Sequence, residues 1–153
     1  MPEFNSGVPV RADAKPDDVS LLCRRAAELI AQQKFDQAEA DLRRAAKLDD
    51  ASADVQLNLG ILYCRRARWR EAIEPLELAV ELDPSRVAGH YFLGEAYNQT
   101  DRHEDALAQY ETVVHLAPDN WRALKGVGIV LDKMGRPAEA TQAYKRAREA
   151  QRK

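Results

Sequence analysis

The sequence has few of the features that mark exported, membrane-bound or metal-binding proteins. It has only two cysteines among 153 residues, Cys23 and Cys64, and they form no CxxC motif. This scarcity argues against a disulfide framework and a metal site, and it favours a reducing compartment. No apolar run approaches the roughly 20 residues of a membrane span, and the N-terminal residues lack the apolar core of a signal peptide. We therefore expect a cytoplasmic protein without membrane contact.

Groupings of residues that would support catalysis are also missing. The three histidines, His90, His103 and His115, have no serine or cysteine partner at a suggestive spacing. There is no Gly-rich phosphate loop and no His/Glu metal pair. Scattered histidines of this kind are more often structural than catalytic. We therefore expect a protein that is not an enzyme, with no cofactor, no metal and no small-molecule substrate.

The net charge of −2 hides an uneven distribution. Residues 87–120 hold six acidic residues against Arg102 alone, whereas residues 121–153 hold nine basic residues against three acidic ones. Neighbouring segments of opposite sign predict a polarised surface. The acidic segment beside the basic one makes nucleic-acid binding an unfavoured interpretation. The basic end, KRAREAQRK, is typical of a solvated helix terminus.

What the sequence does contain is a repeat. Gly60, Gly94 and Gly128 are spaced 34 residues apart, and each is followed 12 residues later by an alanine. Pro84 and Pro118 close two of the units. A fixed period without insertions indicates a repeat architecture.

A weaker copy of the pattern, with Ala26 in the glycine position, precedes these three. The sequence thus predicts an N-terminal arm and four units, at residues 1–18, 19–52, 53–86, 87–120 and 121–153. The first letters of the arm, MPEFNS, are also compatible with an expression-vector remnant, so we assign them no function.

Each unit holds two helical stretches of roughly 13 residues separated by a break, which predicts an all-α fold of helix pairs. We expect the glycines to lie opposite Ala72, Ala106 and Ala140, where they would let the two helices of a unit approach closely. Pro75 falls inside a predicted second helix, where we expect a local kink that is tolerated near the first turn.

The motifs around the glycines, LNLGILY (57–63), HYFLGEAY (90–97) and LKGVGIVL (124–131), resemble the tetratricopeptide repeat (TPR) family. The resemblance covers residues 19–153. It implies a right-handed superhelical solenoid of antiparallel helix pairs, with a concave groove lined by the first helix of each unit. It also implies that this groove binds extended peptides or partner proteins.

Helical spacing then selects the groove residues, which give an apolar and aromatic centre with a polar rim, as a peptide-binding surface requires. The predicted groove residues are Leu57, Asn58, Ile61, Arg65, Tyr91, Phe92, Glu95, Asn98, Arg122, Lys125, Ile129 and Lys133. Three of them have an alternative role, sealing the contacts between neighbouring first helices, and we favour it: Leu57, Ile61 and Phe92. Four others are expected to be exposed in the groove: Arg65, Tyr91, Asn98 and Lys125.

Asn58 occupies a position where many family members carry an asparagine that binds a ligand's backbone, and an amide suits this role because it donates and accepts. The other units lack it, so no asparagine ladder is expected. A subset of the family grips the C-terminal carboxylate of heat-shock chaperones with cationic residues from three units. Units 1 to 3 supply no cation at those positions and units 2 to 4 supply only Arg122, so we reject that ligand.

Two functions remain open. The first is a protein-binding module whose partner segment has a basic part near unit 3 and an acidic part near unit 4. The second is a self-assembling scaffold, because solenoid ends need polar caps. We expect four residues to be partly uncovered at the C-terminal end: Ile129, Leu131, Ala140 and Tyr144. The arm, through VPV (8–10), could instead lie in its own or a neighbour's groove.

Overall fold

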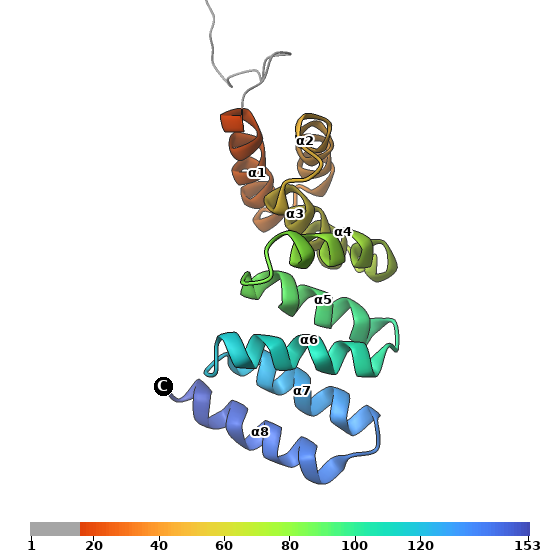
Figure 1. The fold of residues 1–153 in the computed structure, drawn as a ribbon, viewed down its shortest axis with the longest axis vertical. Helices are drawn as coiled ribbons and strands as arrows, with labels where there is room; N and C mark the ends of the chain where they lie inside the picture. The colour runs from red at the N-terminus through yellow and green to blue at the C-terminus, as the bar shows by residue number, and fades with distance from the viewer. Residues whose placement is uncertain (1–15) are drawn as a thin grey trace, which may run out of the picture.

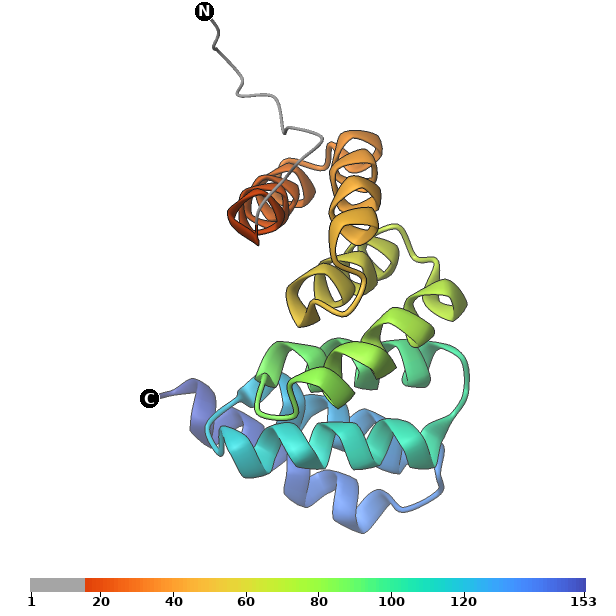
Figure 2. The ribbon, with the colours of Figure 1, turned by 45° about the horizontal axis from the view of Figure 1, so that its top comes forward.

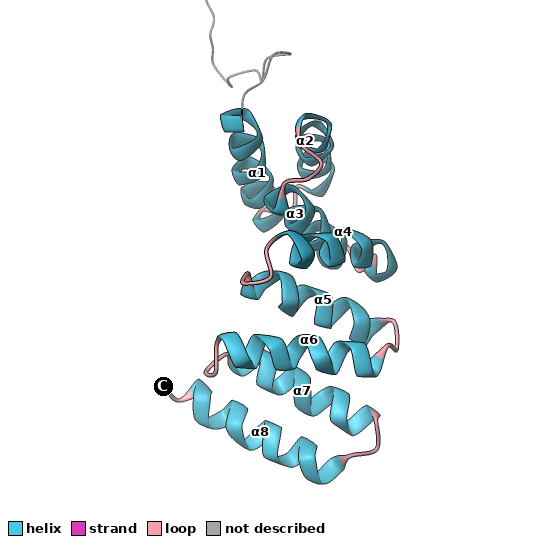
Figure 3. Ribbon diagram, in the orientation of Figure 1, coloured by secondary structure: helices cyan, strands magenta, loops and turns pink. Residues whose placement is uncertain are grey.

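The computed structural model describes residues 16–153, and these residues form eight helices joined by short loops, with no strand among them (Figure 3). The helices are α1 (Pro16–Ala31), α2 (Phe35–Leu48), α3 (Ala53–Arg65), α4 (Trp69–Leu82), α5 (Val87–Gln99), α6 (His103–Leu116), α7 (Trp121–Lys133) and α8 (Pro137–Gln151). Successive antiparallel pairs stack on one another, and the helix axes turn from α1–α2 to α7–α8 (Figures 1 and 2). This confirms the all-α solenoid of helix pairs. Most of the predicted arm, including VPV, lies outside the described residues.

The break inside each unit is a turn with one residue in the left-handed region. These residues are Gln33, Ala67, Asp101 and Gly135, with φ values of 61°, 58°, 63° and 75°. They recur every 34 residues, although only the last is a glycine. Helix α3 then begins with Ser52 Oγ accepting from the Val55 N–H at 3.3 Å, and Asn120 Oδ1 caps α7 in the same way. Repeated turn geometry thus sets the repeated helix pair.

The conserved spacing of glycines creates close contacts, but not with the alanines named above. A Cβ at Gly60 would clash with Leu76 Cδ2, and one at Gly94 would lie 3.0 Å from the ring of Tyr110. The expectation that Gly60, Gly94 and Gly128 face Ala72, Ala106 and Ala140 is therefore wrong: they face the large side chains one helical turn later, at Leu76, Tyr110 and Tyr144. Glycine is needed because these bulky side chains lie directly against the first helix.

Pro75 lies inside the second helix of unit 2, as predicted. It is the seventh residue of α4, and α4 continues past it to Leu82. Because proline has no N–H, the carbonyl of Glu71 loses its helical partner.

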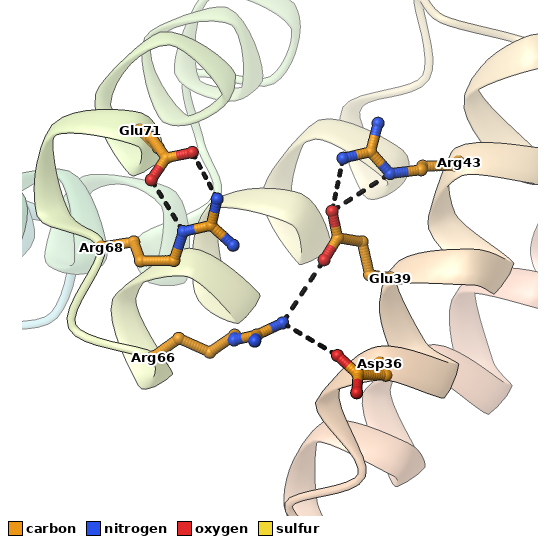
Figure 4. A network of polar contacts seen from close by, with 6 residues as sticks. All are labelled: Asp36, Glu39, Arg43, Arg66, Arg68 and Glu71. Carbon is orange, nitrogen blue, oxygen red and sulfur yellow. Dashed lines mark hydrogen bonds and ion pairs between the residues drawn. The ribbon is translucent and has the colours of Figure 1, made fainter.

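The buried residues separate unit 1 from the rest. One large apolar cluster runs from α3 to α8, while two smaller clusters join α1 and α2 to α3. In α4 and α6, Ile73 and Leu107 pack against the large cluster, but α2 has Glu39 at the equivalent position. Glu39 accepts from Arg43 and forms an ion pair of 3.4 Å with Arg66 (Figure 4). The junction between units 1 and 2 is therefore partly polar.

The outer helix α8 is less apolar than expected on its exposed side. Leu131 and Ala140, which we expected to be partly uncovered, are only 5% and 1% exposed. They are buried because α8 packs closely on α7; Ile129 and Tyr144 are half-buried. At the positions where α6 has Leu107 and Val114, α8 has the exposed Thr141 and Arg148.

Candidate peptide-binding groove

The first helices of the units line one side of the solenoid. Among the described helices, α1 contacts α3, α3 contacts α5, and α5 contacts α7, whereas the second helices of neighbouring units do not contact each other. In a curved stack of helix pairs, the helices on the concave side lie closer together than those on the convex side. The first helices, which contact one another from unit to unit, therefore form the concave side. The predicted groove residues belong to three of these first helices, α3, α5 and α7, and we call the side that these helices form the groove.

The groove contains an open cavity of about 450 Å³ between these three helices. Its lining residues are Cys64, Arg65, Trp69, Tyr91, Phe92, Glu95 and Arg122. Five of these seven are among the predicted groove residues, so the structure brings them together around one space. A cavity of this size, lined by aromatic side chains and a few charged groups, is typical of a ligand pocket.

The aromatic side chains around the cavity hold one another in place. The ring of Tyr91 meets that of Phe92 edge-on at 5.4 Å between centroids, and it lies 6.1 Å from the ring of Tyr110. Tyr110 is fully buried between α5 and α7, and its hydroxyl donates to the carboxylate of Glu95. Such edge-on contacts are favourable for aromatic rings. The cavity wall is thus built on a fixed side chain rather than on a mobile one.

The thiol of Cys64 forms an unreactive part of the wall. Its Sγ lies 3.9 Å from the carbonyl oxygen of Phe92, to which it donates. Burial first, and then the nearby Glu95, raise the pKa of Cys64 to about 12 against the opposing effect of Arg65. A thiol with so high a pKa is neutral at pH 7 and is not a nucleophile.

The charges at the cavity are two arginines and one carboxylate. Within residues 16–153, neither Arg65 nor Arg122 makes an ion pair, although the guanidinium of Arg122 stacks 4.6 Å from the ring centroid of Trp121. Both arginines are exposed, whereas Glu95 is half-buried and accepts from Tyr110. Burial raises the pKa of Tyr91; Glu95 raises it further and Arg122 opposes this.

The remaining predicted groove residues differ in their availability. Asn98 is only 6% exposed and accepts from Lys133 Nζ at 2.9 Å, so the expectation of an exposed Asn98 is wrong. Its amide is instead part of a bond between α5 and α7. Leu57 is 4% exposed, which agrees with the sealing role. The Asn58 amide donates to the Asp54 carbonyl of its own helix at 2.9 Å, and Lys125 is exposed.

Two further groove residues, Ile61 and Ile129, are half-buried, as is Phe92. Sequence reasoning missed Trp69 because it considered only first helices, and Trp69 is the first residue of α4. The tryptophan in the break RARWRE was the available signal. Cys64, which is buried near the end of α3, was also not among the predicted groove residues.

None of the helices within residues 16–153 is both long and apolar enough to cross a membrane. The same residues hold no group of three or more His, Cys, Asp or Glu side chains that could bind a metal ion.

Two family models, both described as Tetratricopeptide repeat, match this sequence, one at residues 29–93 and the other at residues 93–153. The chain belongs to the TPR family. This TPR chain is 29% identical over 92 residues to superkiller complex protein 3 of Mus musculus, covering 60% of the chain and 6% of that protein. It is 28% identical over 110 residues to protein O-mannosyl-transferase Tmtc3 of Drosophila melanogaster, covering 71% and 12%. The TPR chain thus spans only a small part of the length of these relatives.

Solved structures of MamA have the same TPR fold. One matches with a TM-score of 0.81 and 25% identity, covering 90% of this chain and 81% of that one. MamA from Desulfovibrio magneticus RS-1 matches with a TM-score of 0.81 and 18% identity, covering 90% and 77%. These similarities confirm the TPR solenoid.

Proposed function

We propose that this TPR protein is a non-catalytic binding module whose groove holds an extended or helical segment of a partner protein. The observation that supports this most is the cavity between α3, α5 and α7, where aromatic side chains and unpaired arginines face open space. Large aromatic side chains surrounded by polar residues carry most of the binding energy in protein interfaces. Arg65, Tyr91 and Lys125 are the residues we propose to contact the partner first.

The charges of the described residues refine the partner expected from the sequence. Several acidic residues of unit 3 already have partners: Glu95 accepts from Tyr110, Asp105 pairs with Arg102, and Asp119 pairs with Lys153. In contrast, Arg122 and Lys125 make no ion pair within residues 16–153. An acidic part of the partner near unit 4 therefore has the stronger support.

The alternative, a scaffold that assembles end to end, needs an apolar end. Helix α8 exposes Thr141 and Arg148 where α4 and α6 carry half-buried apolar side chains, which supports groove binding over stacking on α8. We therefore treat self-assembly as the second candidate.

The test of groove binding is a pull-down from a lysate of the source organism, followed by affinity measurement with the captured protein. Three variants are compared with the wild type: Tyr91→Ala, Lys125→Glu and, as a control on the exposed face of α8, Lys145→Glu. We expect the two groove variants to weaken binding by about tenfold or more, with unchanged helicity by circular dichroism, and the control to bind as the wild type does. Equal binding by all four proteins would overturn the assignment of the groove.

A further inference from the structure

The cavity in the groove has an excess of positive charge that the protein itself does not neutralise. Many arginines within residues 16–153 are held by a neighbouring carboxylate, among them Arg25, Arg43, Arg66, Arg68, Arg86, Arg102 and Arg136. The two arginines that line the cavity, Arg65 and Arg122, are not. They lie on α3 and α7, on opposite sides of the residues that α5 contributes. A ligand in the cavity therefore lies between two guanidinium groups.

Glu95 is the only carboxylate that lines this cavity, and it does not cancel that charge. It accepts the hydroxyl of Tyr110 from the core, so part of its hydrogen-bonding capacity is used inside the protein. A basic side chain entering the cavity would meet two arginines for one carboxylate. An acidic group at the rim would instead meet two guanidinium groups, which form strong, often bidentate, hydrogen bonds with carboxylates.

The interior of the cavity calls for a different kind of group. Trp69, Tyr91 and Phe92 line it, all of them half-buried, and the neutral thiol of Cys64 closes it. A volume of about 450 Å³ has room for one large side chain. An apolar or aromatic side chain would gain burial against these rings and aromatic contacts in addition.

We infer that the groove recognises a linear motif in which a large apolar or aromatic residue is flanked by acidic residues. This inference rests on the proposed function and names the partner chemistry. The apolar side chain enters the cavity, and the neighbouring carboxylates pair with Arg65 and Arg122. A polypeptide fits better than a nucleic acid, because the cavity takes up one large apolar side chain and unit 3 as a whole is acidic, which disfavours a phosphate backbone.

A library of displayed random 12-residue peptides, selected on the full chain, tests the motif without knowing the partner. We expect the selected peptides to share an aromatic or large aliphatic residue with Asp or Glu within two positions. Each selected peptide is then synthesised in three forms: unchanged, with the apolar residue changed to Ala, and with Asp or Glu changed to Asn or Gln. We expect the second and third forms to bind about tenfold more weakly or worse.

A double-mutant cycle assigns the charges to the two arginines. Both arginines are exposed, so the variant Arg65→Gln/Arg122→Gln should fold, and Arg146→Gln on α8 is the matched control. We expect the double variant to bind the acidic peptide about as weakly as the wild type binds the neutralised peptide. Combining the double variant with the neutralised peptide should cause little further loss of affinity. The control should bind as the wild type does.

The outcomes separate this inference from the proposed function. Selected peptides that bind Tyr91→Ala poorly but show no acidic preference, or bind the double variant normally, would overturn the motif and leave groove binding standing. Peptides that bind Tyr91→Ala as well as the wild type would overturn both. A library that yields no binder, or a single-stranded oligonucleotide that binds through the two arginines, would also overturn the motif.

Discussion

Among single residues, the ring of Tyr110 makes contacts that only glycine permits. It lies between Gly94 of α5 and Gly126 of α7, and a Cβ at Gly126 would lie 2.7 Å from Cζ of the ring. One unit earlier, Leu76 stands in place of Tyr110 and Phe92 in place of Gly126. The smaller side chain of the second helix is thus paired with a larger side chain on the first helix of the next unit. The two pairs indicate that side-chain volumes are adjusted between neighbouring units.

We predict that Gly126→Ala destabilises the fold. Alanine improves helix propensity by about 1 kcal/mol, but overpacking against a fully buried ring costs about 1–3 kcal/mol. Urea unfolding followed by circular dichroism measures the change. In the background of Tyr110→Leu the cost should shrink, because the clash is with the ring. An equal cost in both backgrounds would show that the ring is not responsible.

The left-handed turns predict a substitution that stabilises the fold. Ala67 has φ of 58°, a region that L side chains occupy at a cost of about 1–2 kcal/mol and glycine does not. Ala67→Gly should therefore raise the free energy of unfolding by about 1 kcal/mol. The matched control is Ala108→Gly at an exposed position inside α6, which should lower it by about 1 kcal/mol. Destabilisation in both variants would mean that the turn is not strained.

For the helices, the question is how firmly each pair is joined to the next. Between units 2, 3 and 4 the second helices supply Ile73 and Leu107 to a continuous core. Between units 1 and 2, Glu39 and Arg66 replace such a contact, and Arg66 also pairs with Asp36 (Figure 4). Ion pairs near the surface contribute about 0–1 kcal/mol, less than a buried apolar side chain. In a solenoid, stability depends on such contacts between neighbours.

Hydrogen exchange should therefore reveal unit 1 as the least stable part of the described chain. Amides of α1 and α2 are predicted to exchange through an opening of lower free energy than those of α5 and α6, whose unit has neighbours on both sides. Two-dimensional NMR or peptide-resolved mass spectrometry measures this difference. Exchange of both pairs at one common free energy would instead indicate a single cooperative unit.

The helices themselves were predictable because their signal is periodic. The 34-residue period gave four pairs, and the turns fall at 33, 67, 101 and 135 in agreement with it. The packing partners were less predictable: spacing alone could not tell whether Gly60 faces Ala72 or Leu76, since the two lie one turn apart on the same helix.

The groove was predictable in position and less so in detail. Helical spacing selected Arg65, Tyr91 and Arg122, and in the structure these three line one cavity. It could not show that Asn98 is covered, because the covering Lys133 lies 35 residues away on another helix. Trp69 was missed for a similar reason, as it reaches the cavity from the start of a second helix.

For the whole molecule, the two thiols predict how stability changes with pH. Burial raises the pKa of Cys23 to about 11 and that of Cys64 to about 12, from an ordinary value of 9.0. Above pH 9 the unfolded chain loses thiol protons that the folded chain keeps. The contribution of the two protonated thiols to the free energy of unfolding is thus complete below pH 9. It falls as pH rises towards 11, by at most about 1.4 kcal/mol per pH unit for each thiol. Urea unfolding at pH 8, 9 and 10 should show this decline, and Cys23→Ala/Cys64→Ala should reduce its slope. An unchanged slope would exclude the thiols as its cause.

The state of association also follows from the faces that the molecule presents. Val80 of α4 lies against Gly89 of the next unit, and Val114 of α6 packs against the same core cluster. The equivalent residue of α8 is Arg148, and Thr141 stands where Leu107 does, so the outer face of α8 offers little apolar surface to a second copy.

We therefore predict that the full chain sediments as one species whose mass does not depend on protein concentration between about 1 and 100 μM. Association with a micromolar dissociation constant would change the mass within this range. The variant Thr141→Leu/Arg148→Val restores the apolar pattern of the inner units and should shift the molecule towards association. Association of the wild type itself would favour the scaffold alternative. If it were then abolished by Tyr91→Ala, the groove would be the surface that holds the second copy; if it survived, the contact would lie elsewhere on the chain.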